Sequence, residues 1–282
     1  MAVGKAREQR ALQRQERLMD EHVPAIRPGG FCGPLLFLRP RQLPPPVAFC
    51  SMPSPLIPVP PATFDAAIVD LDGTMVDTLG DFAEAIRRML ADLQLPAIDA
   101  AQIEPMVGKG SEHLLRSVLK HVLPAADSLQ AEALYPAALD AYQRHYLQIN
   151  GQHSAVYPGV LEGLQALRAA GLRLACLTNK PGDFAGPLLQ AKGLDGFFDQ
   201  VFGGDAFERK KPDPLPLLKT CEALGTLPAR TLMIGDSSND AQAARAAGCP
   251  VVLVTYGYNH GRPARDVDAD GYVDSLAELR PA

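Results

Sequence analysis

From residue 63 onward, the chain alternates short apolar runs with segments of helical periodicity. The apolar runs are rich in β-branched and aliphatic residues and most end on a polar residue, which is typical of buried strands. They predict strands over residues 64–70, 172–179, 200–204, 230–236 and 250–256. Apolar positions at helical spacing predict helices over residues 160–171, 214–225 and 238–248. Strands that alternate with helices in this way indicate an α/β fold, with a parallel sheet covered on both faces.

Residues 80–151 interrupt this alternation. Three segments in this range have apolar positions at helical spacing, and no strand is predicted between them: 82–95, 111–123 and 128–149. We therefore expect an all-helical domain over residues 80–151. It is inserted into an α/β core formed by residues 63–79 and 152–282.

The first 62 residues differ from the rest of the chain. They contain 12 of the 26 prolines, and 8 Lys and Arg against 4 Asp and Glu. Proline at this density removes backbone donors and prevents helix formation, so we expect a disordered, Pro-rich and basic amino-terminal extension over residues 1–62. A translation start near Met52 would also account for this composition. Neither interpretation gives the extension a catalytic role.

Composition excludes some classes of protein. No run approaches the roughly 18 consecutive apolar residues that a membrane span needs. Residues 63–282 hold 19 Lys and Arg against 28 Asp and Glu, and an acidic body argues against nucleic-acid binding. The five cysteines are widely spaced, with no C-x-x-C pair, which argues against a zinc ribbon or a disulfide framework. We expect a cytoplasmic protein that binds neither membranes nor nucleic acid.

The first predicted strand leads directly into Asp70-Leu71-Asp72-Gly73-Thr74. The carboxyl end of a strand in an open α/β sheet borders the crevice where ligands bind, so both carboxylates are candidates for chemistry. A calcium-binding EF-hand loop is excluded, because its sixth position requires glycine and Met75 stands there. A plain acidic turn remains an alternative for this motif taken alone.

Polar residues also follow the other predicted strands. Thr178 and Asn179 end the second, Lys211 follows the third, and Asp236 ends the fourth, with Asp240 four residues later. Each has a simple structural explanation alone: a helix cap, a solvated charge or a turn. Because the carboxyl ends of parallel strands meet at one edge of a sheet, their occurrence together favours a functional site.

The segments DLDGT, TN, KPDP and GDSSND resemble, in this order, the four motifs of the haloacid dehalogenase-like phosphatases. The resemblance covers about residues 64–280 and implies a Rossmann-like parallel sheet core with an inserted all-helical (C1-type) cap domain. The second aspartate, Asp72, implies the phosphohydrolase or phosphomutase branch. Four further segments resemble the phosphoglycolate phosphatases, although subfamilies acting on other small phosphates share much of them: VGKGSEHLL, YPGV, KKPDPLPLL and YGYNHG.

The resemblance implies roles for the aspartates. Asp70 would attack phosphorus and form an aspartyl-phosphate. Asp72 would protonate the leaving alkoxide and then deprotonate the attacking water. Mg²⁺ would be held by the side chains of Asp70 and Asp236 and by the backbone carbonyl of Asp72. Asp240 would orient Lys211 or a metal-bound water.

The remaining candidates would contact the substrate. Lys211 and the Thr178 hydroxyl would bind phosphoryl oxygens. Asn179 would shape the loop or touch the substrate. Lys109 stands between Gly108 and Gly110, either in a plain helix connector or in a loop that meets the carboxylate of a small acid such as 2-phosphoglycolate.

These expectations combine into one predicted function. The chain would be a Mg²⁺-dependent phosphomonoester hydrolase of small phosphorylated metabolites, with 2-phosphoglycolate as the leading substrate and a monomeric or homodimeric state. Three alternatives stay open: a phosphatase of a sugar phosphate or of pyrophosphate, a sugar-phosphate mutase, and a non-enzymatic scaffold.

Overall fold

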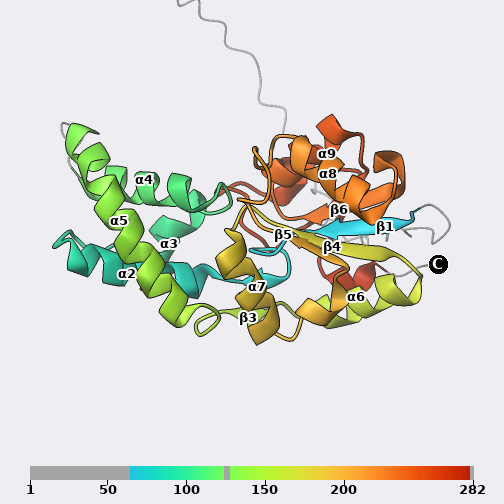
Figure 1. Cartoon of the computed structure of the whole chain (residues 1–282), viewed down its shortest axis with the longest axis horizontal. Helices are drawn as coiled ribbons and strands as arrows, with labels where there is room; N and C mark the ends of the chain where they lie inside the picture. Colours follow the sequence, from blue (N-terminus) through green and yellow to red (C-terminus); the bar gives the residue numbers. More distant parts are fainter. Residues whose placement is uncertain (1–63, 124–127, 280–282) are drawn as a thin grey trace, which may run out of the picture. The chain divides into compact units, whose positions relative to one another are not determined.

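The computed structural model describes residues 64–123 and 128–279, so the predicted extension over 1–62 lies outside the described residues. Six parallel strands form one sheet in the order β5–β4–β1–β6–β7–β8 (Figure 1). Their bounds are β1 (Ala66–Val69), β4 (Arg173–Leu177), β5 (Gln200–Phe202), β6 (Thr231–Gly235), β7 (Val251–Val254) and β8 (Gly271–Val273). The predicted α/β fold with a parallel sheet is confirmed.

Helices cover both faces of the sheet (Figure 1). On one face lie α6 (Val160–Ala169) and α7 (Gly182–Ala191), and on the other lie α8 (Leu215–Leu224) and α9 (Ser238–Ala247). Successive strand side chains point to opposite faces. In β1, Ala67 and Val69 therefore join the core beneath α6 and α7, while Ala66 and Ile68 join the core beneath α8 and α9. Burial on both faces explains why the strands read as continuous apolar runs.

The order of the strands reverses at β1. From β1 the chain adds β4 and β5 toward one edge, and then returns to place β6, β7 and β8 on the other side. Val69 of β1 pairs with Cys176 of β4 and with Ile234 of β6, so the three strands end at the same level. Ligands bind outside the carboxyl ends of strands at such a switch point.

A separate set of helices follows β1, namely α2 (Leu79–Asp92), α3 (Ala100–Ile103), α4 (Ser111–Val122) and α5 (Ser128–Ile149). We call residues 79–149 the helical insertion. It has its own buried cluster, which includes Ile86, Leu115 and Tyr142. Where the chain leaves and re-enters the sheet domain, two short antiparallel strands pair, β2 (Val76–Asp77) and β3 (Ala155–Val156).

Several observed elements were not predicted. They are α3, α7, β2, β3, β8 and five 3₁₀ turns, η1 (Glu104–Met106), η2 (Asp195–Phe197), η3 (Pro228–Arg230), η4 (Ala264–Asp266) and η5 (Leu276–Glu278). Helix α7 contains Gly182, Gly186 and Pro187, which obscure its helical pattern. The missed strands have only two or three residues, too few to show a period. Among the described residues, no helix is long and apolar enough to cross a membrane.

Asp81 ties the beginning of the helical insertion to the segment that follows it. This buried carboxylate accepts hydrogen bonds from the backbone N–H groups of Gly151 (2.9 Å) and His153 (2.7 Å).

Asp81→Ala leaves both donors unpaired, so we predict a loss of about 2–4 kcal/mol in the free energy of unfolding. Urea denaturation measures this loss. Asp140→Ala, on an exposed part of α5, is the control and should change stability by less than about 0.5 kcal/mol. Equal losses in the two variants would contradict the prediction.

Candidate active site

The loop after β1 carries Asp70 to the edge of the sheet. The Asp70 backbone N–H still donates to Ile234 of β6, at 2.9 Å. The loop then turns at Gly73, which has a φ of +82°. A Cβ atom at this position would lie 2.2 Å from Asp236 Oδ2, so only glycine permits the close approach. The turn thus brings the Asp70–Thr74 loop against the end of β6.

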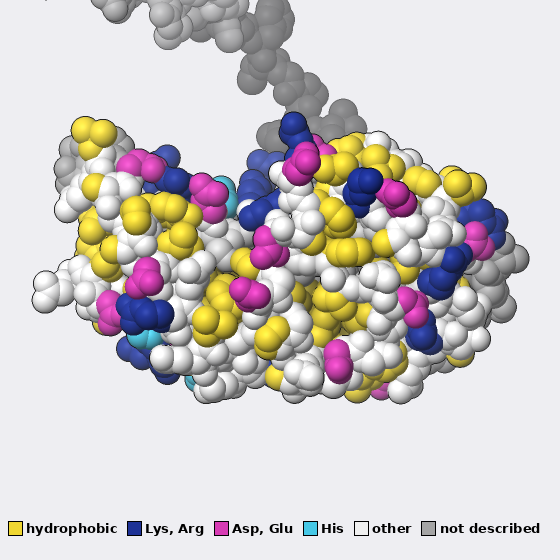
Figure 2. Space-filling view, in the orientation of Figure 1, with side chains coloured by type: hydrophobic (Ala, Val, Ile, Leu, Met, Phe, Trp, Pro, Cys, Tyr) yellow, Lys and Arg dark blue, Asp and Glu magenta, His cyan; other side chains and the backbone are white. Residues whose placement is uncertain are grey.

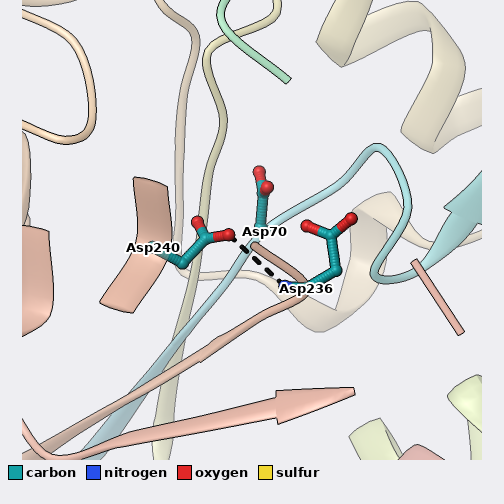
Figure 3. A group of neighbouring side chains, drawn as sticks. All are labelled: Asp70, Asp236 and Asp240. Carbon is teal, nitrogen blue, oxygen red and sulfur yellow. Dashed lines mark hydrogen bonds between the residues drawn. The ribbon is translucent and has the colours of Figure 1, made fainter. Parts of the chain in front are cut away.

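Three buried aspartates meet at this edge. Asp70, Asp236 and Asp240 come from the ends of β1 and β6 and from the first turn of α9, and each offers one oxygen within 4.8 Å of the others. Figure 3 shows the carboxylates of Asp70 and Asp236 extending in the same direction. One oxygen of Asp240 instead accepts a hydrogen bond from the Asp236 backbone N–H, at 3.3 Å.

Asp240 is held by the way its helix begins. Ser237 is the N-cap of α9 and forms a capping box with Asp240, whose Oδ2 accepts from the Ser237 N–H (3.1 Å) and hydroxyl (2.8 Å). The other oxygen, Oδ1, accepts from Lys211 Nζ at 2.7 Å. Because both oxygens already have partners within the protein, the geometry suits Asp240 to positioning Lys211.

Lys211 is buried beside the aspartates. Its Nζ donates to the Leu177 carbonyl (2.8 Å) and forms ion pairs with Asp240 (2.7 Å) and Asp70 (3.0 Å). Burial lowers the pKa of Lys211, but the two carboxylates outweigh it and raise this pKa above the ordinary value. Asn179 fixes the lysine backbone: its Oδ1 accepts from Lys211 N (3.0 Å) and its Nδ2 donates to Lys211 O (2.8 Å).

The cluster has an excess of negative charge. Its three carboxylates face one ammonium group, that of Lys211. Burial, with a contribution from Asp240, raises the pKa of Asp70 to about 7 despite the opposing effect of Lys211. Burial, Asp240 and Asp70 likewise raise the pKa of Asp236. Carboxylate oxygens are the hard ligands that Mg²⁺ prefers, and here the single ammonium group does not balance their charge. The cluster therefore fits a divalent cation such as Mg²⁺.

Asp72 lies outside this cluster and pairs with a different lysine. Its Oδ1 lies 3.1 Å from the Nζ of Lys180, a buried lysine in the loop after β4. Lys180 Nζ also donates to the Tyr146 hydroxyl of α5 and lies 4.6 Å from the centroid of the Phe82 ring of α2. Lys180 was not predicted from the sequence. Its only signal was its place directly after Thr178 and Asn179.

A cavity lies between the ends of β1 and β4 and the helical insertion. The first side is lined by Asp70, Asp72, Thr178, Asn179 and Lys180, and the second by Phe82, Val107, Gly108, Gly110, Ser111, Leu114 and Tyr142. Of the other residues named from the sequence, Lys211, Asp236 and Asp240 cluster with Asp70. Lys109 is exposed and lines a separate depression with Arg245 and His260.

The motif order and this geometry agree with comparisons to known proteins. The sequence model described as haloacid dehalogenase-like hydrolase matches residues 67–254. The chain belongs to this family. The predicted resemblance to this family is therefore confirmed.

Members of the family with closely similar sequences are named for one activity. The chain is 46% identical over 218 residues to a phosphoglycolate phosphatase of Thiobacillus denitrificans, covering 77% of this chain and 95% of that protein. It is 44% identical to a plasmid-encoded phosphoglycolate phosphatase of Cupriavidus necator, covering 76% and 90%. A crystal structure of a predicted phosphoglycolate phosphatase from Haemophilus somnus matches with a TM-score of 0.73 and 34% identity, covering 77% and 96%.

The raised pKa of Asp70 predicts a pH-dependent cost in stability. The folded protein holds this proton more tightly than the unfolded chain, so the metal-free protein loses stability as the pH rises from 3.8 to about 7. Asn cannot ionise. In EDTA at pH 8, Asp70→Asn should therefore raise the free energy of unfolding, by up to about 4 kcal/mol. Urea denaturation at pH 8 and pH 5 measures the difference, which should shrink at pH 5. A variant that is destabilised equally at both pH values would refute this.

Proposed function

We propose that this protein is a Mg²⁺-dependent phosphomonoester hydrolase and that its substrate is 2-phosphoglycolate, which it converts to glycolate and phosphate. The observation that carries the proposal is the buried Asp70 at the switch point of the sheet, fixed against Lys211 at 3.0 Å and facing a cavity. The substrate is supported by relatives that are named phosphoglycolate phosphatase, at 44–46% identity.

The placement of two aspartates supports the proposed reaction. One oxygen of Asp70 attacks phosphorus, the bond to the ester oxygen breaks, and Asp72 gives that oxygen a proton. Water then attacks the aspartyl-phosphate, Asp72 takes a proton from this water, and the bond between phosphorus and Asp70 breaks. Asp72 lines the same cavity as Asp70 without joining the buried carboxylate cluster, which supports separate roles for the two groups.

The other residues would hold the phosphoryl group and balance its charge. Lys211 supplies a fixed positive charge, and the Thr178 hydroxyl is a donor at the cavity wall. Mg²⁺, held by Asp70, Asp236 and the Asp72 carbonyl, would offset the repulsion between the phosphate ester and the carboxylates. Asp240 keeps the Lys211 ammonium group next to Asp70.

We infer that the helical insertion acts as a cap over this reaction, within a cap domain of residues 80–151. It supplies seven of the described residues that line the cavity, among them Phe82, Leu114 and Tyr142. Apolar side chains at this place would exclude water while Asp70 attacks phosphorus.

We also propose that the protein acts on a small metabolite and that it is cytoplasmic. On the face drawn in Figure 2, Lys and Arg side chains are interspersed with Asp and Glu, which gives that face no extended basic surface for nucleic acid. Three described cysteines are free and buried, Cys176, Cys221 and Cys249, as suits a reducing compartment.

Phosphate release from a panel of esters tests the proposal. The purified protein is assayed with Mg²⁺ and with EDTA on 2-phosphoglycolate, hexose phosphates, nucleoside monophosphates and pyrophosphate. We expect the highest kcat/KM for 2-phosphoglycolate, and no turnover in EDTA. A higher value for another ester would overturn the substrate, and release unaffected by EDTA would overturn the metal requirement.

Metal binding is predicted to depend on Asp236. Mg²⁺ that binds only the folded protein raises the Tm, by several degrees at about 100 times its Kd. Asp236→Asn removes one of two carboxylates that face the same way, so the Tm increase on adding Mg²⁺ should be largely lost. Differential scanning calorimetry without substrate measures this increase. Asp140→Asn is the exposed control and should keep it, and an undiminished increase in Asp236→Asn would refute the prediction.

The role of Asp72 is predicted to depend on the leaving group. Asp72→Asn should lower kcat/KM on 2-phosphoglycolate by about 10²–10⁴-fold, because the alkoxide leaves without a proton, and kcat/KM does not include the later hydrolysis of the aspartyl-phosphate. The loss should be much smaller on p-nitrophenyl phosphate, whose phenolate leaves without protonation. Steady-state kinetics on both esters measure the two losses. If both fall by the same factor, Asp72 does not serve as the general acid.

A further inference from the structure

Lys180 is a second buried lysine at the cavity, separate from Lys211. Lys180 is 4% exposed. It follows β4 and lines the cavity together with Asn179 and residues of the helical insertion. Among the described residues that line this cavity, Lys180 is the only one with a positive charge. Burying an ammonium group is costly unless it binds an opposite charge, and Asp72 supplies that charge to Lys180.

The partners of Lys180 leave part of its binding capacity unused. Its Nζ donates to Asp72 Oδ1 at 3.1 Å and to the Tyr146 hydroxyl, and it lies 4.6 and 4.5 Å from the ring centroids of Phe82 and Tyr146. A lysine ammonium group carries three protons. Oxygen atoms of two described residues accept from Nζ, so the ammonium group has the capacity to donate to one further acceptor.

The location of Lys180 matches the shape of a phosphorylated hydroxy acid. Asp72, as the proposed general acid, contacts the ester oxygen of the substrate. In 2-phosphoglycolate one CH₂ group separates this oxygen from the carboxyl carbon, so the carboxylate oxygens lie roughly 2.7–3.6 Å from it by ordinary bond lengths and angles. Lys180 Nζ lies one hydrogen bond from Asp72. An ester oxygen at Asp72 therefore brings the carboxylate within reach of Lys180.

We propose that the Lys180 ammonium group binds the carboxylate of the substrate and so selects phosphate esters of short 2-hydroxy acids. The inference rests on the proposed function and names the residue responsible for its specificity. Lys109, the candidate that the sequence suggested for this contact, is exposed and lines a different depression. Tyr146 and Phe82 position Lys180 from the helical insertion, so the cap would contribute to specificity through this lysine.

A comparison of two esters tests the proposal. Lys180→Met keeps the apolar stem and removes the charge. The substrates are 2-phosphoglycolate and 2-hydroxyethyl phosphate, which has a hydroxymethyl group in place of the carboxylate. Because Lys180→Met also removes the hydrogen bond to Asp72, we expect this variant to lower the turnover of both esters. Loss of the carboxylate contact should lower kcat/KM for 2-phosphoglycolate by a further factor of about 100. Lys120→Met, on the exposed face of α4, is the charge-matched control and should leave the ratio unchanged.

Binding measurements give a second readout that does not need turnover. In an Asp70→Asn background, 2-phosphoglycolate should raise the Tm more than 2-hydroxyethyl phosphate does. Adding Lys180→Met should abolish this difference. The comparison remains informative if Lys180→Met alone releases no phosphate from either ester.

The outcomes separate this inference from the proposed function. Equal losses on both esters, with the difference in Tm increase retained, would make Lys180 purely structural and overturn the inference. A selective loss in Lys109→Met, and none in Lys180→Met, would also overturn it. In either case a wild-type preference for 2-phosphoglycolate would leave the proposed function standing. A wild-type protein without that preference would contradict the proposed function itself.

Discussion

The buried contact of Lys211 with Asp70 and Asp240, at 3.0 and 2.7 Å, is the interaction on which the site depends. It allows the Asp70 carboxylate to lie in the interior, because an unpaired buried charge is costly. One ammonium group does not balance three aspartates, however, and the pKa of both Asp70 and Asp236 is raised. The site therefore favours the binding of an additional positive charge. Without that charge, the excess of negative charge lowers the stability of the folded protein.

The sheet provides this contact through its topology. The neighbouring strands β4, β1 and β6 end at one level, which brings Asp70, Asn179 and Asp236 to the same edge, and Lys211 joins them from the loop that follows β5. Local features then fix each side chain: Gly73 permits the close approach to Asp236, the capping box holds Asp240, and Asn179 holds the Lys211 backbone. The capping box is local in the sequence, whereas the other two contacts join segments that are far apart in the chain. The helical insertion adds only the far wall of the cavity and the residues around Lys180.

The sequence predicted the parts of this arrangement that follow from local pattern. Period and composition identified the strands β1, β4, β6 and β7, and the polar residues at their ends pointed to Asp70, Thr178 and Asp236. Lys180 was not predicted, because its burial depends on Tyr146 and Phe82, which reach it from distant parts of the chain. Lys109 was a candidate because glycines flank it. In the structure it lines a separate depression, because the spacing of residues does not determine the direction of a side chain.

The most direct test of this account is to find where the phosphoryl group goes. The protein is mixed with 2-phosphoglycolate and Mg²⁺, quenched in acid after milliseconds, and reduced with borohydride, which converts an acyl phosphate to an alcohol and leaves free carboxylates unchanged. Peptide mass spectrometry then locates the reduced residue. We predict homoserine at position 70, absent when EDTA is present or substrate is omitted. A reduced residue at any other aspartate, or phosphate release in the same reaction without any reduced residue, would contradict it.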